Sequence, residues 1–405
     1  SRKKDQTSTV KNISSDEIDI LPVEDIGAVV NMQAGVVAGS FRGGRNNEVS
    51  YMIDGVPVND AFGGVSAVST LEVEAVKDLE IITGTFNAEY GNAMSGVVNA
   101  VTKDGSNRFE GSLNSNYSTY ITDNKRNGEE LFIGLDPFGI NSNYDTRFNI
   151  SGPLVKDKVY FFSNFRIQDV NGHLNGVNRY QVWNLSDFYD QDTTNWTSEN
   201  TGDSMYVPMG TGNYSTYMGK VSFNLGNIKF SVMRNINNGN SKGYNHIYKY
   251  NPNGRSHQDT KTTLDMFQLN HFMNSKMFYD FKFSRTKNDY GFYVFEDYDS
   301  YSIVSEDGNY KGLDLLAGDT LYNYVNDKYM TAFGTGFFTG GQDKGHLKRT
   351  LITNNIKFDF TIQANSAHSI KTGFSFINYE LDNAGKPIRN AYTGTPLEGD
   401  SYKPI

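Results

Sequence analysis

The sequence predicts an all-β fold, a transmembrane antiparallel β-barrel of which this chain supplies about nine strands, preceded by a smaller α/β unit. Three observations predict it. Apolar and polar residues alternate with a period of two from residue 107 onward, very short turns alternate with long polar segments, and a glycine-punctuated block over residues 41–103 fits neither pattern. The 26 tyrosines, 27 phenylalanines and 40 glycines also favour β-structure over helix.

The period of two is clearest in residues 351–363. There Ile352, Ile356, Phe358, Phe360 and Ile362 share one face, whereas Thr353, Asn355, Lys357, Asp359, Thr361 and Gln363 share the other. The same division predicts strands at 217–225, 277–284 and 369–376, and weaker versions predict strands at 109–117, 146–152, 158–167, 228–234 and 264–274. These lengths suit tilted strands that cross a bilayer.

The connections between these strands alternate in length. Four are very short, at 155–158, 225–227, 274–276 and 364–368, and four are long and polar, near 120–143, 170–213, 237–262 and 289–347. In an up-and-down barrel this alternation puts all short turns at one rim and all long loops at the other. A soluble sandwich or propeller, the alternative for such strands, has no reason to sort its loops in this way, and its repeated apolar face would promote aggregation.

Charge and composition exclude several classes of function. The net charge of −9 and a pI near 5.2 provide no basic surface for nucleic acid, and the lack of cysteine excludes disulfides and thiolate sites. No run of about 18 apolar residues predicts a membrane helix. The mean hydropathy of −0.54 still allows a membrane barrel, because only every second strand residue faces lipid. The start SRKKDQTSTV is not a signal peptide, so we expect a cytosolic protein, a chain that begins after processing, or a start that lies outside this sequence.

Residues 1–104 predict a small mixed α/β unit. Residues 1–12 are polar and indicate a solvated lead, Ser14 or Ser15 is a suitable N-cap for a helix, and residues 24–32 can form a second short helix. Strand patterns follow at 48–55, 76–84 and 95–103. The first of these ends at Asp54-Gly55, a strong turn signal, and Pro57 disfavours a continued central strand.

Two stretches of this unit resemble the plug signatures of TonB-dependent outer-membrane receptors. FRGGRNNEVSYMIDGVPVND (41–60) resembles the first signature, an Arg-Gly pair followed by an I-D-G-x-P turn, and FNAEYGNAMSGVVNAVTK (86–103) resembles the second. The stretch that continues to SGPLVKDKVYFFSNF (151–165) looks most like the Oar-like branch, whose members bear a carboxypeptidase-regulatory domain. Ser95 stands where the second signature has the first of two glycines, and Ala100 where it has a β-branched residue.

The resemblance implies a receptor in the outer membrane of a Gram-negative bacterium, with residues 1–104 as the plug and 105–405 as the N-terminal part of the barrel. The family's barrel has about 22 strands, so we expect this chain to be a fragment that lacks both ends. Substrate is expected to bind the long external loops and the plug, and the TonB energy-transducing complex to pull on a segment before residue 1. Outer-membrane lipid is a further expected partner.

A second hypothesis follows from the same resemblance. Oar-like relatives leave open a barrel that serves protein export or surface assembly, with the loops as an interaction platform. Its partners would be a surface lipoprotein lid or a secretion component.

The candidate site residues are those of the plug signatures, to which the resemblance assigns the plug–barrel contacts. They are Arg42, Gly43, Gly44, Arg45, Asp54, Gly55, Glu89, Tyr90, Gly91, Gly96 and Asn99. We expect Arg42 and Arg45 to pair with carboxylates of the barrel rather than with ligand, and the glycines to serve tight turns and close backbone approach. Since a polar interface can be broken without exposing a core, we expect polar contacts to hold the plug.

Other chemistry has little support in the sequence. FRGGRNN lacks the spacing of a P-loop, the six histidines form no cluster with metal-ligand spacing, and no nucleophile has a placed base, so we predict no enzyme, cofactor or metal site. The acidic segments 189–203 and 296–309 could hold calcium, although solvated surface is the simpler interpretation.

Overall fold

The computed structural model describes most of the chain. The described residues are 9–21, 25–33, 35–37, 39–41, 43–45, 48–58, 71–84, 90, 94–122, 125–135, 143–188, 190–296, 313–314, 321–322, 324–330, 336–365, 367–396 and 398. No helix in these ranges is long and apolar enough to cross a membrane.

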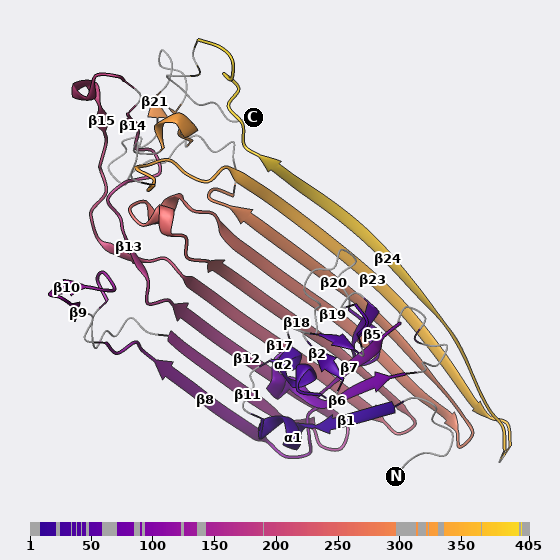
Figure 1. The fold of residues 1–405 in the computed structure, drawn as a ribbon. Coiled ribbons are helices and arrows are strands. Elements are labelled where there is room, and N and C mark those ends of the chain that lie inside the picture. Colours follow the sequence, from indigo (N-terminus) through magenta and orange to yellow (C-terminus); the bar gives the residue numbers. More distant parts are fainter. Residues whose placement is uncertain are drawn as a thin grey trace.

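Nine long strands form one antiparallel sheet, which we call the wall (Figure 1). They are β8 (Glu110–Ser118), β11 (Asn143–Val155), β12 (Val159–Asn171), β17 (Thr211–Leu225), β18 (Ile228–Lys242), β19 (His257–Asn274), β20 (Met277–Tyr293), β23 (Gly345–Gln363) and β24 (Ser369–Pro387). Each pairs with the next along the chain, in the order β24-β23-β20-β19-β18-β17-β12-β11-β8. All nine strands expected from the alternation are therefore confirmed.

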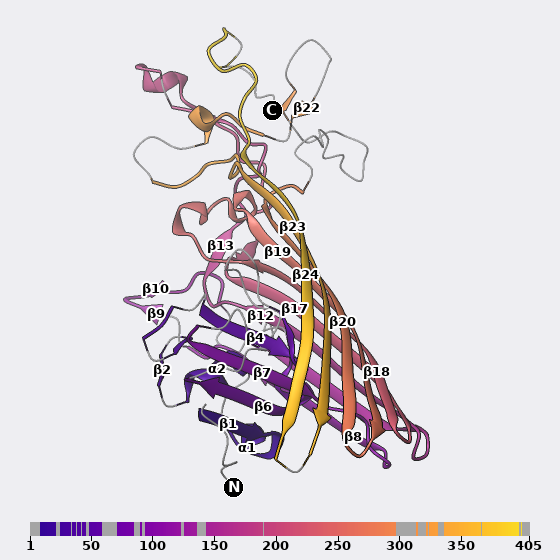
Figure 2. The same ribbon diagram turned by 90° about the vertical axis from the view of Figure 1, so that its right-hand side faces the viewer.

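The loops sort to the two rims as expected. Short turns join β11 to β12, β17 to β18, β19 to β20 and β23 to β24 at one end of the wall, and the long connections gather at the other end (Figures 1 and 2). The strands extend further toward the long loops than the alternation indicates. β20, for example, continues to Tyr293 rather than ending at residue 284.

The N-terminal residues form a separate five-stranded mixed sheet in the order β1-β6-β7-β4-β5. Its elements are β1 (Thr9–Ser14), α1 (Ser15–Asp19), α2 (Ile26–Asn31), β4 (Val49–Ile53), β5 (Val56–Pro57), η3 (Val73–Ala75), β6 (Val76–Thr83) and β7 (Gly96–Thr102), with the two-stranded β2 (Val36–Val37) and β3 (Ser40–Phe41) beside it. Ser14 caps α1 in a capping box with Glu17, as the N-cap signal predicts. Pro57 lies on the edge strand β5.

One expectation for this unit is wrong. Residues 9–12 are not a solvated lead, because β1 pairs antiparallel with β6 along its whole length. Ile13 is buried in the core, and six backbone pairings stabilise a segment whose polar composition gives little strand signal. Residues 1–8 lie outside the described part of the chain.

Smaller elements lie in the long connections. They are β9 (Lys125–Arg126), β10 (Glu129–Glu130), β13 (Asn175–Val177), β14 (Ser186–Asp187), η4 (Thr193–Asn195), β15 (Thr197–Ser198), β16 (Tyr206–Pro208), η5 (His246–Tyr248), η6 (Pro252–Gly254), β21 (Leu313–Asp314), β22 (Leu321–Tyr322) and η7 (Asp327–Tyr329).

The five-stranded unit packs against one face of the wall, near the end with the short turns, and the wall curves around it (Figure 2). We call this the inner face and the opposite one the outer face. One buried cluster joins the two parts, since Phe162, Met218, Met233, Leu264 and Met266 of the wall pack with the apolar core of the unit. The candidate functional site lies at this contact between the five-stranded unit and the wall.

Candidate functional site

The wall has opposite chemistry on its two faces. Because side chains alternate along a strand, the residues that reach the five-stranded unit fix which positions face inward. Lys220, Lys282 and Lys357 reach it, whereas the neighbouring Val221, Phe283 and Phe358 point outward. The inner face thus presents charged side chains to the unit at these positions, and the outer face at the same level is apolar.

The Asp54-Gly55 turn between β4 and β5 is the centre of the contact. Asp54 has φ 49° and Gly55 has φ 78°, the left-handed conformations of a two-residue hairpin turn, so the turn prediction is confirmed. The Asp54 carboxylate accepts hydrogen bonds from the Thr102 N–H at 2.8 Å and hydroxyl at 2.6 Å. Asn99 accepts the Gly55 N–H at 2.8 Å, which ties the turn to β7.

Three lysines of the wall converge on this turn. Lys282 Nζ donates to the Asp54 carbonyl at 2.7 Å, and Lys357 Nζ, on the neighbouring strand, donates to the Gly55 carbonyl at 3.4 Å. Lys220 Nζ lies 3.6 Å from the Asp54 carboxylate, donates to the Thr102 hydroxyl at 2.9 Å and pairs with Asp104 at 2.9 Å. The Lys220 and Asp54 side chains are only 5% and 7% exposed, so the buried Asp54 carboxylate depends on the nearby Lys220 ammonium group.

A second ionic contact lies between η3 and strands β11 and β12. Asp145 of the wall bonds Arg166 twice at 2.8 Å and Arg147 at 2.7 Å. Arg166 reaches Glu72 at 3.0 Å and Arg147 reaches Glu74 at 3.4 Å. One wall carboxylate therefore orients two arginines toward two glutamates of the unit.

Burial disfavours the ionised form of the Glu72 carboxyl. Desolvation raises the pKa of its carboxyl, which the charge of Arg166 and a hydrogen bond from Thr216 partly oppose. Glu72 is only 7% exposed, so its ionised form depends on the nearby guanidinium.

An apolar patch lies between the two ionic contacts. Met218, Met233, Leu264 and Met266 are at most 3% exposed and belong to the same cluster as Ile53 and Val56 of the unit. The expectation of polar contacts is therefore incomplete, because sulfur and methyl groups fill the centre of the interface. Methionine suits such a place, since its flexible chain adapts to an irregular surface.

The structure describes eight of the eleven candidate residues. Arg42, Glu89 and Gly91 lie outside the described residues. The Arg45 side chain is exposed, and the backbone N–H of Arg45 donates to the Glu48 carboxylate at 3.1 Å within the same loop. Among the described ion pairs that join the unit to the wall, the polarity is opposite to the expected one, with acids on the unit and bases on the wall.

The remaining candidates have local roles. Gly44 and Gly96 permit close approach, since a Cβ on Gly44 would lie 2.5 Å from that of Ser95 and one on Gly96 would lie 2.8 Å from the Phe41 ring. Gly43 has φ 82° and no atom near its missing Cβ. Tyr90 packs against the small cluster of Met52, Ile82 and Val97.

Sequence reasoning missed most of the contact residues, namely Glu72, Glu74, Thr102 and Asp104 of the N-terminal segment and Arg147, Arg166, Lys220, Lys282 and Lys357 of the wall. A signal was present for part of this set. Lys220, Lys282 and Lys357 each lie on the polar face of an alternating strand, and a cation there needs a partner on the inner side of the wall.

Replacing Gly55 with alanine should loosen the turn. The left-handed conformation costs about 1–2 kcal/mol for alanine, and its Cβ would lie 2.9 Å from Lys282 Nζ, which must move away. Gly43→Ala is the matched control, because φ is 82° there and nothing lies within 4 Å. Hydrogen exchange in β4 and β5 should accelerate in Gly55→Ala more than exchange in β2 and β3 does in Gly43→Ala, and equal acceleration would contradict a role for the Lys282 contact.

The long loops interlock at the opposite rim. Val177 donates its N–H to Lys249 at 2.7 Å, Phe338 to Ile247 at 2.8 Å and Asp343 to Gly254 at 2.7 Å, so three different connections share backbone bonds. Val325 and Met330 form a small core there with Leu185, Tyr329 and Phe338. The described parts of these loops therefore form one preorganised surface.

The first acidic segment has local hydrogen bonds. Asp190 accepts the Asp192 N–H at 2.8 Å, and Asp192 in turn accepts the Thr194 N–H at 3.0 Å. No group of three or more metal-ligating side chains occurs among the residues that the structure describes. Of the second segment, 296–309, only residue 296 is described.

Known proteins match both parts of the chain. A family model described as the TonB-dependent receptor plug domain matches residues 2–97. The TonB-dependent transporter Oar of Myxococcus xanthus is 38% identical over 128 residues, which cover 31% of this chain and 12% of that relative. A probable TonB-dependent siderophore receptor, PirA of Acinetobacter baumannii, is 28% identical over 182 residues, or 38% of this chain and 22% of that relative.

Solved structures share the whole arrangement. The alcaligin outer-membrane receptor FauA from Bordetella pertussis aligns with a TM-score of 0.57 at 13% identity over 97% of this chain and 50% of its own. The outer-membrane transporter YddB from Escherichia coli aligns with a TM-score of 0.54 at 10% identity over 92% of this chain and 48% of its own. The chain thus spans about half the length of these structures.

The family consists of receptors and transporters rather than enzymes, and its members lie in the outer membrane of Gram-negative bacteria. The five-stranded unit is the plug, and the wall is part of the barrel around it. The plug-domain match, the TonB-dependent relatives and the shared fold all indicate a TonB-dependent outer-membrane receptor.

Proposed function

We propose that the complete receptor imports a substrate through its barrel, and that energy delivered by the TonB complex rearranges the plug. Residues 1–104 would act as the plug and 105–405 as the N-terminal part of the barrel. The observation that carries the proposal is the interface itself: a separately folded unit is held on the inner face of the wall by two ionic contacts and one apolar patch. Noncovalent contacts of this kind can be broken and remade.

The opposite rim supports the same function. The interlocked loops form a preorganised external surface, which reduces the entropic cost of binding a substrate. Substrate would bind this surface and the side of the plug that faces it. The candidate residues of the plug signatures, Arg42, Arg45 and Glu89 among them, remain proposed contacts of the plug with the barrel.

The test uses the absence of cysteine from the chain. Ser50→Cys places a nearly isosteric thiol on β4, where Ser50 is 6% exposed, and labelling of this thiol by a membrane-impermeant maleimide reports plug movement in living cells. We expect labelling in energised cells and its loss on deletion of TonB or addition of an uncoupler. Thr197→Cys, exposed on an external loop, is the control that should label under all conditions. Equal labelling of Ser50→Cys with and without TonB would overturn the proposal.

A further inference from the structure

The plug and the inner face of the wall have opposite net charges. Residues 1–104 contain 15 acidic and eight basic side chains, which gives a net charge of −7. The inward positions of the nine wall strands, those on the same face as Lys220, contain eight basic and four acidic side chains, an excess of four positive charges. The inner face is therefore left with a positive charge when the acidic plug moves away from it.

Two of the inward lysines contact only neutral groups of the plug. Lys282 and Lys357 lie directly opposite each other in the register of β20 and β23. Lys282 Nζ donates to the Asp54 carbonyl at 2.7 Å, and Lys357 Nζ donates to the Gly55 carbonyl at 3.4 Å. Lys357 has a wall carboxylate, Asp359, at 3.5 Å, whereas Lys282 forms no ion pair among the residues that the structure describes. Neutral donors would bind these carbonyls without placing two like charges side by side, so the turn alone does not account for the lysine pair.

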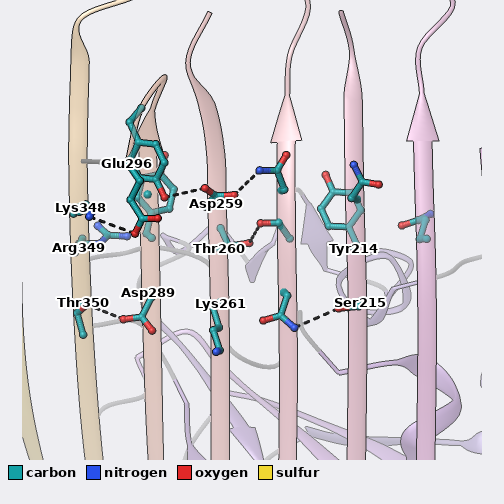
Figure 3. Close-up of a pocket in the computed structure, with 18 of the residues that line it drawn as sticks. Tyr214, Ser215, Asp259, Thr260, Lys261, Asp289, Glu296, Lys348, Arg349 and Thr350 are labelled. Atoms are coloured by element: carbon teal, nitrogen blue, oxygen red, sulfur yellow. Dashed lines mark hydrogen bonds and ion pairs between the residues drawn. The ribbon is translucent and has the colours of Figure 1, made fainter. Parts of the chain in front are cut away.

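A hollow of about 700 Å³ near the long loops has a different balance of charge (Figure 3). Its lining includes three carboxylates and three cations. Lys348 lies 3.3 Å from Glu296 there, and Asp289 accepts a hydrogen bond from Thr350 at 2.7 Å. Because the charges of this hollow balance, the excess of positive charge is a property of the inner face beside the plug.

We propose that the substrate of this receptor is an oxyanion, a molecule with carboxylate or phosphate groups, and that Lys282 and Lys357 bind it during its passage. The Asp54-Gly55 turn holds this position while the plug is docked, since its two carbonyl oxygens occupy the two ammonium groups. Once the plug moves, an oxyanion can bridge both lysines through charge-assisted hydrogen bonds. The inference rests on the proposed import function and adds the chemistry of the substrate.

Other classes of substrate fit the lysine pair less well. A neutral sugar would replace the hydrogen bonds of the turn but would supply no counter-charge, and a cation would be repelled by the excess of positive charge. Asp280 and Asp359 lie directly opposite each other, two residues further toward the short turns. These carboxylates weaken the binding of an anion at the lysine pair, which suits a passage site, because the substrate must also leave it.

Hydrogen exchange of the purified complete receptor tests this inference without TonB. The probes are citrate and pyrophosphate, each compared with chloride at equal ionic strength, with EDTA in every sample to exclude chelation of divalent cations. An anion that binds only the undocked state multiplies the opening of the plug by 1 + [L]/Kd. Exchange in β4 and β5 should therefore accelerate about tenfold when the probe is at ten times its Kd, and a titration of the probe gives this Kd.

Lys282→Gln/Lys357→Gln is the variant that tests the site. Glutamine can still donate to the two carbonyl oxygens of the turn but brings no charge, so we expect the probes to act no differently from chloride. Lys229→Gln/Lys276→Gln removes two exposed lysines at the short-turn end and should respond to the probes as the wild type does. The ratio of the rates in probe and in chloride is taken within each variant, which removes any change in docking itself.

Equal exchange of the wild type in citrate, pyrophosphate and chloride would overturn the inference. So would a probe effect that persists in Lys282→Gln/Lys357→Gln, or one that is lost equally in both double variants. A stronger effect of citrate supports a carboxylate substrate, and a stronger effect of pyrophosphate supports a phosphate. TonB-dependent labelling of Ser50→Cys without any probe effect would leave the import function standing and remove only the oxyanion assignment, so the two failures are distinguishable.

Discussion

Replacing Lys220 with alanine is expected to accelerate hydrogen exchange in the plug strands β4 and β7 by about 100-fold or more. The substitution removes the only lysine that forms an ion pair with the Asp54 carboxylate among the described residues, and breaking one side of a buried pair costs about 3–5 kcal/mol. Thr102 keeps two hydrogen bonds to Asp54 but brings no charge. Exchange measured by mass spectrometry on the complete receptor gives the change in opening free energy directly.

Two further variants make this prediction specific. Lys229→Ala removes a lysine from an exposed position near the short turns and should leave plug exchange unchanged. Asp54→Asn combined with Lys220→Met removes both charges, so it should recover most of the lost protection, because neutral replacement of a whole buried pair is often close to neutral in energy. No recovery in the double variant would show that Lys220 acts through packing rather than through its charge.

Replacing Arg166 with methionine is expected to make plug docking dependent on pH. Burial already raises the pKa of Glu72, and removal of the guanidinium that opposes this effect would raise it further. A carboxyl with a raised folded pKa contributes its stability below its unfolded pKa, near 4.5, and loses it as the pH rises through the folded value. The variant plug should therefore dock more tightly at pH 5 than at pH 8.

The measurement is hydrogen exchange in the plug at pH 5 and pH 8, corrected for the intrinsic exchange rate of the amide hydrogens at each pH. Glu72→Gln in the Arg166→Met background should abolish the pH dependence, since it keeps the shape of the side chain and removes the titrating group. Persistent pH dependence in that double variant would assign the effect to another carboxyl of the network, with Asp145, which bonds Arg166 twice at 2.8 Å, as the first alternative.

The strands of the wall could be predicted where apolar outward residues alternate with polar inward residues. The sequence from residue 277 to 284 alternates in polarity and predicts the first half of β20. Beyond it Arg285, Lys287 and Asp289 point outward while Thr286 and Asn288 point inward, so both faces are polar and the period of two disappears. The upper part of β20, from Arg285 to Tyr293, was not predicted for this reason.

The plug contacts could be predicted only in part. The Asp54-Gly55 turn has a local signature, and so it was found. Its partner Lys282 lies 228 positions away, and nothing in the local sequence links the two. Arg45 belongs to a recognisable signature, but in the structure its backbone bonds the nearby Glu48, whereas Glu72 and Arg166 belong to none.

The apolar patch on the wall has a consequence for how a displaced plug would return to its place. Any displacement of the plug wets Met218, Met233, Leu264 and Met266, and covering a buried side chain of this size again is worth roughly 1.5–3 kcal/mol. Displacing the plug from the wall therefore costs free energy, whereas its return lowers the free energy. In the proposed import function, the hydrophobic effect would therefore return a displaced plug to the wall.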